Sequence, residues 1–218
     1  MNLGLEGKRA LVLASSSGLG RAVATELARE GARVAVCSRE LGRVEEAAEA
    51  IRAETGGEVH AFEADVSEDA SLKALVASAV DAMGGLDLLV CNAGGPPPGG
   101  FDALDESKWD WAYQLTLQSV VRSIRHARPH LEAGSDAAIL AIASSSVKRP
   151  IPNLLLSNVF RPAIHALTNA VADEFAPLGI RVNCLSPGRI HTDRVDDLDR
   201  AKAERMGKTF EVVRSASL

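Results

Sequence analysis

The chain has 218 residues, of which 46% are apolar and 24% charged, and its formal net charge is −5. A chain of this size and composition is expected to fold as a soluble globular protein without disulfides or structural metals. The acidic balance, with no run of Lys or Arg, gives no electrostatic case for binding nucleic acid or an anionic membrane.

No uninterrupted apolar stretch approaches the roughly 20 residues that a membrane-spanning helix needs, and the N-terminus lacks the apolar core of a signal peptide. A cytoplasmic protein is therefore expected. The cysteines, Cys37, Cys91 and Cys184, are widely spaced and match no zinc-binding pattern. We expect buried, reduced thiols and no metal site.

Apolar runs alternate with segments of helical periodicity along the chain. Strands are predicted over residues 9–14, 33–37, 58–64, 86–91, 137–143 and 181–185. Helices are predicted over residues 19–30, 41–54, 71–83 and 108–131, and over a further segment that ends at Pro177. The apolar runs are continuous, which is typical of strands covered on both faces. The sequence therefore predicts one α/β domain over residues 1–218, with a doubly wound parallel sheet.

The character of the chain changes after Thr192. Residues 193–218 are dense in charge and carry only scattered apolar side chains. Two interpretations have equal weight, namely a solvated helix and a lid over a substrate.

A loop of small residues separates the first predicted strand from the first predicted helix. Its candidate cofactor-binding residues are Ser16, Ser17, Gly18, Leu19 and Gly20. Glycines at this place allow the backbone to turn tightly and to approach a pyrophosphate, while the helix N-terminus offers unpaired N–H groups to the anion. The pattern predicts a dinucleotide site, since the loop stands between a strand and a helix.

The second predicted strand ends at Ser38 and Arg39. An NAD site commonly has an acid here, whose carboxylate binds the ribose hydroxyls and repels a 2′-phosphate. Ser38 takes the place of that acid, and Arg39 can pair with a phosphate. These residues favour NADP over NAD. The alternative is that Arg39 is an ordinary surface charge, since the acidic Glu40 follows it directly.

The loop resembles the T-G-x-x-x-G-x-G signature of the short-chain dehydrogenase/reductase superfamily, with Leu13 and Ala14 where Thr and the first Gly usually stand. Further motifs of the superfamily follow in order: Asp65-Val66 resembles the pair that contacts adenine, Asn92-Ala93-Gly94 the N-A-G motif, and Pro187-Gly188 with Thr192 the segment beside nicotinamide. The resemblance covers about residues 8–192. It implies a Rossmann fold, bound NADP or NAD, and a small carbonyl or alcohol substrate.

The resemblance also locates a catalytic centre that departs from the usual pattern. The superfamily uses a Ser, a Tyr, a Lys four residues after the Tyr, and an Asn on the preceding long helix. Alignment places Ser144 at the Ser position, Ser157 at the Tyr position, Arg161 at the Lys position and Thr116 at the Asn position. A serine hydroxyl is a poor general acid, and an arginine stays protonated but can stabilise an oxyanion.

Pro162 leaves two arrangements open. If one helix contains both Ser157 and Arg161, the two lie on one face and can point together into the cleft. If a helix instead begins at Pro162, Ser157 is out of line with Arg161. Independently of this geometry, His191 beside Thr192 is a candidate proton donor in place of the usual tyrosine.

The segment Ser146-Val147-Lys148-Arg149-Pro150, followed by Leu156-Ser157-Asn158 and Arg161, resembles a less common branch of the superfamily. Members of that branch are named after 3-oxoacyl-(acyl carrier protein) reductases or sugar dehydrogenases. In this context Lys148 is either a cation near the cleft or an exposed loop lysine.

We therefore expect an NADP(H)-dependent oxidoreductase with a variant active site. The alternative is a non-catalytic dinucleotide-binding sensor or scaffold. The resemblance implies a homodimer or homotetramer formed through the long helices. It also implies a further strand and helix that the sequence, which ends at Leu218, does not contain.

Overall fold

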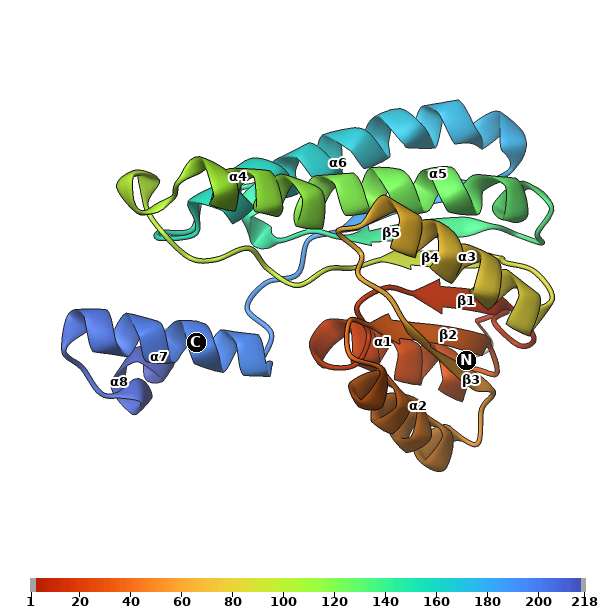
Figure 1. The fold of residues 1–218 in the computed structure, drawn as a ribbon, viewed down its shortest axis with the longest axis horizontal. Coiled ribbons are helices and arrows are strands. Elements are labelled where there is room, and N and C mark those ends of the chain that lie inside the picture. The colour runs from red at the N-terminus through yellow and green to blue at the C-terminus, as the bar shows by residue number, and fades with distance from the viewer. Residues whose placement is uncertain (1–2, 217–218) are drawn as a thin grey trace. The chain divides into compact units, whose positions relative to one another are not determined.

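The structure is a computed structural model that describes residues 3–216. These residues form two compact units, one that ends at Ser186 and a smaller one that begins at Pro187. The larger unit holds six parallel strands in the order β3-β2-β1-β4-β5-β6 (Figure 1). The strands are β1 (Arg9–Val12), β2 (Arg33–Ser38), β3 (Val59–Glu63), β4 (Leu88–Cys91), β5 (Ala138–Ile142) and β6 (Arg181–Leu185). The predicted doubly wound parallel sheet is confirmed.

The order of the strands changes direction at the centre of the sheet. Strand β1 pairs with β2 on one side and with β4 on the other, so the chain crosses from one half of the sheet to the other after β3. In sheets of this kind, ligands bind beyond the carboxyl ends of the strands at the crossing point. The loops after β1, β4 and β5 therefore define where a site is expected.

Helices cover both faces of the sheet. Helices α1 (Gly18–Arg29) and α2 (Leu41–Thr55) lie on one face, and α3 (Asp69–Met83), α5 (Ser119–Glu132) and α6 (Leu155–Phe175) lie on the other (Figure 1). Continuous apolar strands suit this arrangement at β1 and β2, which contact α1 on one face and α3 on the other. Strand β6 is instead buried at Val182 and exposed at Arg181 and Asn183. Within residues 3–216, no helix combines the length and the apolarity needed to cross a membrane.

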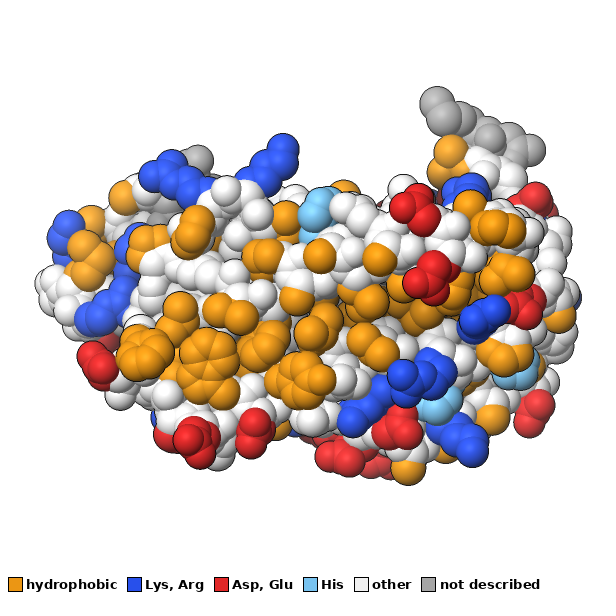
Figure 2. Space-filling view, turned by 90° about the horizontal axis from the view of Figure 1, so that it is seen from above, with side chains coloured by type: hydrophobic (Ala, Val, Ile, Leu, Met, Phe, Trp, Pro, Cys, Tyr) orange, Lys and Arg blue, Asp and Glu red, His pale blue; other side chains and the backbone are white. Residues whose placement is uncertain are grey.

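The outer face of the helical layer is also partly apolar. Figure 2 shows hydrophobic side chains gathered along the face that carries α4, α5 and α6. Trp111, Tyr113 and Val159 belong to this layer and are 41%, 37% and 43% exposed. Beside them, the rings of Trp109 and Phe160 meet edge to face with centroids 6.0 Å apart. We call this outer surface of α4–α6 the helical face.

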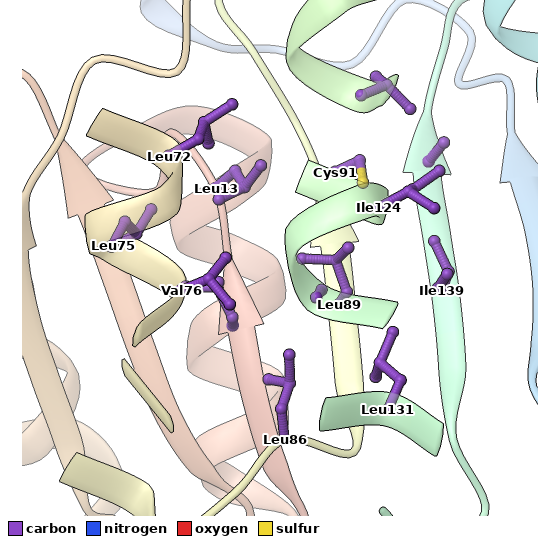
Figure 3. Close-up of a cluster of buried hydrophobic side chains, with 14 of the residues drawn as sticks. Leu13, Leu72, Leu75, Val76, Leu86, Leu89, Cys91, Ile124, Leu131 and Ile139 are labelled. Carbon is purple, nitrogen blue, oxygen red and sulfur yellow. The ribbon is translucent and has the colours of Figure 1, made fainter. Parts of the chain in front are cut away.

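The larger core lies between the sheet and the layer of α3, α5 and α6 (Figure 3). Leu13, Leu89 and Ile139 point into it from the strand side, and Val76 and Ile124 from the helices. All five side chains are at most 5% exposed. This packing fixes the carboxyl ends of β1, β4 and β5 relative to one another.

The predicted helix over residues 108–131 is interrupted. Helix α4 (Glu106–Ala112) continues into a π-helical turn, η2 (Tyr113–Gln118), before α5 begins at Ser119. A π-helical turn leaves backbone groups out of the regular i to i+4 pattern and is frequent at functional sites. The prediction of one uninterrupted helix is therefore wrong over the six residues of η2.

The helix predicted over residues 71–83 begins two residues earlier, at Asp69. Ser71, the first residue of the predicted helix, lies inside α3, and its Oγ accepts a hydrogen bond from the Asp65 backbone N–H at 3.0 Å. The hydroxyl therefore fixes the turn that leaves β3 instead of the helix end.

The smaller unit contains two helices, α7 (Asp193–Met206) and α8 (Phe210–Ser215). Two guanidinium groups lie over the Phe210 ring, that of Arg200 at 5.6 Å and that of Arg214 at 5.7 Å from its centroid. The Thr192 Oγ accepts a hydrogen bond from the Val195 N–H and so caps α7. Residues 193–216 therefore form a helical pair with its own contacts.

The cysteines behave largely as predicted. Cys37 and Cys91 are buried and unpaired, and burial raises the pKa of each thiol to about 12. Cys184 is also unpaired but is only partly buried, so the prediction of burial is wrong for that residue. The described cysteines form no disulfide.

Candidate active site

The loop between β1 and α1 is held in a tight conformation by Ser15. Its Oγ donates a hydrogen bond to the Val12 carbonyl at 2.7 Å and accepts one from the Cys37 N–H at 3.0 Å. The side chain therefore joins the ends of β1 and β2. Ala14, at the first-glycine position of the family motif, has a φ of +47°, in the left-handed region that favours glycine.

Gly20 and Asn92 lock this loop against α1 and β4. A Cβ on Gly20 would lie 2.5 Å from the Ala14 carbonyl oxygen and 2.8 Å from the Asn92 Nδ2, so only glycine fits. The Asn92 Nδ2 donates to the carbonyls of Leu13 at 3.3 Å and Ala14 at 3.0 Å. Asn92 thus shapes the loop directly.

The first turn of α1 can receive an anion. Ser17 stands at the N-cap position, but its side chain forms no capping hydrogen bond. Ser17 and Gly18 are exposed, and the first turn contains no acidic side chain. The N–H groups of this turn and the positive end of the helix dipole therefore suit a pyrophosphate.

The end of β2 offers one unpaired cation. The Ser38 Oγ donates to the Glu40 carbonyl at 2.9 Å and accepts from the Glu40 N–H, which forms a tight turn. The Glu40 carboxylate lies 3.5 Å from the Arg43 guanidinium. Arg39 is exposed and forms no ion pair with any residue in the described part of the chain. Glu40 therefore does not neutralise Arg39 in this structure.

The residues after β3 form a second small turn. The Asp65 Oδ1 accepts hydrogen bonds from the Ser67 N–H at 2.8 Å and the Ser67 Oγ at 2.7 Å. The Arg122 guanidinium donates to the Ser67 carbonyl at 2.8 Å, which ties the turn to α5. Val66 is 6% exposed and contributes to the core. Asp65 and Val66 are thus fixed in place beside β1 and β2.

The loop after β5 carries Ser144. This residue caps a short 3₁₀ turn, η3 (Ser145–Val147), because its Oγ accepts from the Ser146 N–H at 3.1 Å. The Ser146 Oγ reaches the Ser157 carbonyl at 3.5 Å. The loop after β5 and the first turn of α6 are therefore adjacent.

Ser157 and Arg161 lie on one helix. Helix α6 begins at Leu155 and runs through Pro162, so a helix that starts at Pro162 is excluded. The proline cannot donate a hydrogen bond to the Asn158 carbonyl, which removes one bond from the helix. Because the two residues are four apart, the helix presents Ser157 and Arg161 on the same face.

Arg161 is 8% exposed, and its Nη1 donates a hydrogen bond to the Ile142 carbonyl at 2.7 Å. The guanidinium therefore reaches the carboxyl end of β5, next to the loop that carries Ser144. It acts as a tether between α6 and β5 and brings a permanent positive charge to this edge of the sheet.

Thr116 lies in the π-helical turn η2 and is 1% exposed. Its Oγ1 has no hydrogen-bond partner, alone among the buried side-chain oxygens and nitrogens of residues 3–216. Leaving a buried hydroxyl unpaired costs roughly 1–3 kcal/mol. An orphan of this kind is expected where a group meets a ligand or a water molecule.

The remaining candidate residues differ in their surroundings. Lys148 is exposed in the loop after η3. Pro187, Gly188, Thr192 and His191 belong to the smaller unit, where the His191 Nε2 pairs with Asp196 at 3.1 Å. On α5, the His126 Nε2 pairs with Asp69 at 2.9 Å. In the part of the chain that the structure describes, no three His, Cys, Asp or Glu side chains converge on a potential metal site.

Sequence reasoning missed the role of Asn158. Its Oδ1 accepts from the Ile151 N–H and its Nδ2 donates to the Ile151 carbonyl, both at 2.9 Å. Gly99 pairs with Leu154 in an isolated parallel bridge, which joins this loop to the Gly/Pro-rich loop after β4. The Leu-Ser-Asn sequence contained the residue, but no local pattern indicates an amide clamp across seven residues.

Comparison with known proteins agrees with this arrangement. The sequence profile described as short chain dehydrogenase matches residues 8–203. Dehydrogenase/reductase SDR family member 4 of Sus scrofa is 37% identical over 218 residues, and the alignment covers 96% of this chain and 76% of the relative. The chain therefore belongs to the short-chain dehydrogenase family and is related to oxidoreductases.

Two solved structures extend the comparison. L-sorbose reductase from Gluconobacter frateurii, complexed with NADPH and L-sorbose, matches with a TM-score of 0.91 and 30% identity, over 97% of this chain and 80% of that one. The NADH-dependent reductase A1-R′, complexed with NAD, matches with a TM-score of 0.81 and 29% identity, over 88% of this chain and 82% of that one. A nicotinamide dinucleotide is the cofactor class of these neighbours.

Proposed function

We propose that the protein is an NADP(H)-dependent oxidoreductase that interconverts a carbonyl and an alcohol. The observation that carries this proposal is the β1–α1 loop, where Gly20 and Asn92 hold a turn that presents unpaired N–H groups to an anion. When bound, NADPH supplies the hydride, which is added to the carbonyl carbon while the oxygen takes a proton.

The cofactor-binding residues are assigned by position. The pyrophosphate is assigned to Ser16, Ser17, Gly18, Leu19 and Gly20, the adenine to Asp65 and Val66, and the nicotinamide half to Asn92, Ala93, Gly94, Pro187, Gly188 and Thr192. Arg39 supports NADP over NAD, since it is exposed and unpaired while Glu40 is engaged with Arg43. The NAD-bound neighbour keeps NAD as the competing cofactor.

The catalytic groups are proposed to bind and polarise the substrate rather than to titrate. Ser144 is assigned to the substrate oxygen, because its hydroxyl lies at the carboxyl end of β5. Arg161 brings positive charge to the same edge and stabilises a developing alkoxide. Ser157 lies on the Arg161 face of α6 and is assigned to relay the proton through water.

Thr116 is proposed to complete the site as a positioning residue. Its unpaired Oγ1 is able to accept a proton from one partner and donate to another, which an alkyl side chain cannot do. The π-helical turn that carries this hydroxyl packs against both α5 and α6. We assign to it one end of a water-mediated chain that includes Ser157.

Fluorescence titration with NADPH and NADH is the first test. Tighter binding of NADPH, reduced in Arg39→Gln, supports the cofactor assignment. NADPH oxidation is then followed with a panel of ketones that includes 3-oxoacyl thioesters and sugars. Ser144→Ala and Arg161→Ala are expected to lower turnover more than cofactor affinity. Cofactor binding without turnover of any ketone would favour a dinucleotide sensor. If neither cofactor binds, both the oxidoreductase and the sensor hypotheses are refuted.

The helical face supports a homodimer or homotetramer. Exposed apolar side chains gather along it (Figure 2), and surfaces of this kind commonly pack against a second protein surface. We propose that Val159 lies in the contact, so Val159→Asp is expected to lower the mass measured by light scattering. Leu178→Asp is the control, because Leu178 is 40% exposed but lies in the turn η4 (Ala176–Leu178) after α6. An unchanged mass in Val159→Asp would place the contact elsewhere.

A further inference from the structure

Charge is distributed unevenly around the candidate active site. No Asp or Glu occurs between Asp136 and Asp173, although the whole chain carries an excess of acids. The same stretch contains three permanent cations, Lys148, Arg149 and Arg161. It includes β5, the loop that carries Ser144, and most of α6. The wall of the site formed by this stretch is therefore positively charged in a protein that is negative as a whole.

Two of these cations are exposed and unpaired. Lys148 and Arg149 both lie on the surface, and neither forms an ion pair with any of residues 3–216. About half of the other arginines of the described chain, such as Arg9 and Arg43, have a carboxylate partner. An exposed pair of adjacent cations that forms no ion pair is a suitable site for an anionic group.

The two cations are held close to Ser144. The backbone N–H groups of Lys148 and Arg149 donate to the Ser145 carbonyl at 3.0 and 3.3 Å. Ser144 is the N-cap of η3 and Lys148 its C-cap, so one short turn separates the two residues. A lysine side chain extends several ångströms further, which brings its ammonium within reach of a small molecule held at Ser144.

The loop is fixed on its other side as well. The Asn158 amide clamps the backbone of Ile151 with two hydrogen bonds of 2.9 Å. The Gly99 N–H donates to the Asn153 carbonyl at 2.8 Å, which joins the loop to the segment after β4. The backbone that carries the cations is therefore ordered beside Ser157 and α6, and little entropy is lost there when an anion binds.

We infer that the carbonyl substrate carries an anionic group, a carboxylate or a phosphate ester, that is bound by Lys148 and Arg149. This inference rests on the proposed function, because it places the carbonyl at Ser144. It restricts the substrate class to oxo acids and phosphorylated ketones in which a short chain separates the anion from the carbonyl.

Matched pairs of ketones test the inference. 4-Oxopentanoate is compared with its methyl ester, and hydroxyacetone phosphate with hydroxyacetone. Affinity is measured by calorimetry with and without NADP⁺, which carries no hydride, so binding is observed without turnover. We expect the charged member to bind about tenfold more tightly in at least one pair. The pair that shows this preference distinguishes a carboxylate from a phosphate site.

Two double variants assign the preference to residues. Lys148→Gln/Arg149→Gln is expected to abolish the advantage of the charged member. Lys73→Gln/Arg125→Gln removes the same charge from exposed positions on α3 and α5 and is expected to retain it. Raising the salt concentration from about 0.05 to 0.5 M should weaken the advantage, since exposed charges are screened.

Equal affinity for both members of every pair would overturn the inference, as would a preference that survives in Lys148→Gln/Arg149→Gln. Failure of the proposed function gives a different result, in which no ketone supports NADPH oxidation while the charged members still bind preferentially. Turnover of neutral and charged ketones with equal kcat/KM and equal affinity would keep the proposed function and refute the anion site.

Discussion

Asp87 is expected to be the most costly carboxylate to neutralise in this protein. It lies between the last turn of α3 and β4 and is 2% exposed. Its Oδ2 accepts from the Arg9 backbone N–H at 3.0 Å and the Arg9 Nε at 2.8 Å. Its Oδ1 accepts from the Arg9 Nη2 and the Ser135 N–H, both at 2.8 Å. One carboxylate thus joins β1, β4 and the loop before β5.

Replacing Asp87 with Asn keeps the shape but removes the charge and turns one acceptor into a donor. The new amide N–H faces either the guanidinium of Arg9 or the backbone N–H groups, all of which are donors. Breaking one partner of a buried ion pair costs about 3–5 kcal/mol. Arg9 is partly exposed, with a side-chain exposure of 23%, and water recovers part of that loss. We therefore expect Asp87→Asn to destabilise the fold by about 2–4 kcal/mol.

Thermal and urea unfolding measure this effect. In a protein of this size, about 1 kcal/mol lowers Tm by roughly 2–4 °C, so Asp87→Asn should lower Tm by about 4–16 °C. Asp136→Asn is the matched control. Asp136 pairs with Lys8 at 3.0 Å, but its side chain is 82% exposed, and Asn tolerates its φ of +51°. Loss of the ion pair between Asp136 and Lys8 should lower the free energy of unfolding by under about 1 kcal/mol.

The pH dependence gives the result that would refute this reasoning. Burial alone raises the pKa of Asp87, but the hydrogen bonds from Arg9 and Ser135 outweigh it and hold the pKa well below its usual range. A depressed pKa stabilises the fold above the unfolded value, about 3.9, and this contribution is lost as pH falls toward the folded value. The difference between the parent and Asp87→Asn should therefore be full at pH 7 and shrink below about pH 4. If Asp87→Asn and Asp136→Asn lowered the free energy of unfolding by the same amount at pH 7, the role assigned to Asp87 would be contradicted.

Three substitutions test the site. Ala14→Gly should raise stability by about 0.5–1 kcal/mol in urea unfolding, because glycine adopts the observed φ of +47° without strain; a loss of stability would contradict the assigned strain. Gly20→Ala should weaken NADPH binding at least tenfold in titration, since its Cβ would meet the Ala14 carbonyl, whereas Gly42→Ala, with open space around it, should bind normally. Thr116→Val should raise stability by about 1 kcal/mol, because it removes an unpaired buried hydroxyl, and should lower kcat if that hydroxyl orders water; unchanged kcat would remove Thr116 from the site.

The alternation of apolar runs was sufficient to predict the sheet. The strand predicted over residues 181–185 coincides with β6, and that over 33–37 falls one residue short of β2. Residues 33–37 form an apolar run that is buried after Arg33, whereas residues 181–185 alternate, with Val182 buried and Asn183 exposed. Strand ends were less reliable, because β1 stops at Val12 where the Ser15 side chain begins the loop.

The parts of the site that were missed depend on contacts between distant segments. A helical periodicity predicts the helix over residues 108–131, but the same pattern accommodates one wider turn, η2, which packs against α6. Arg161 was expected to face the cleft, and the hydrogen bond to Ile142, nineteen residues earlier, has no sequence signal. The resemblance placed Ala14 where the family motif has glycine, and the structure gives this residue a φ of +47°.

The composition of the site leads to one last expectation, for the pH dependence of turnover. The only tyrosine of the chain, Tyr113, hydrogen-bonds to Gln118 and is 37% exposed on the helical layer. A site formed by hydroxyls and a guanidinium has no group that changes charge near neutrality. We therefore expect kcat/KM to vary less than about threefold between pH 6 and 9, with Tyr113→Phe giving the same profile. A bell-shaped profile would show that a titrating donor acts in catalysis, and loss of that shape in His191→Gln would identify it.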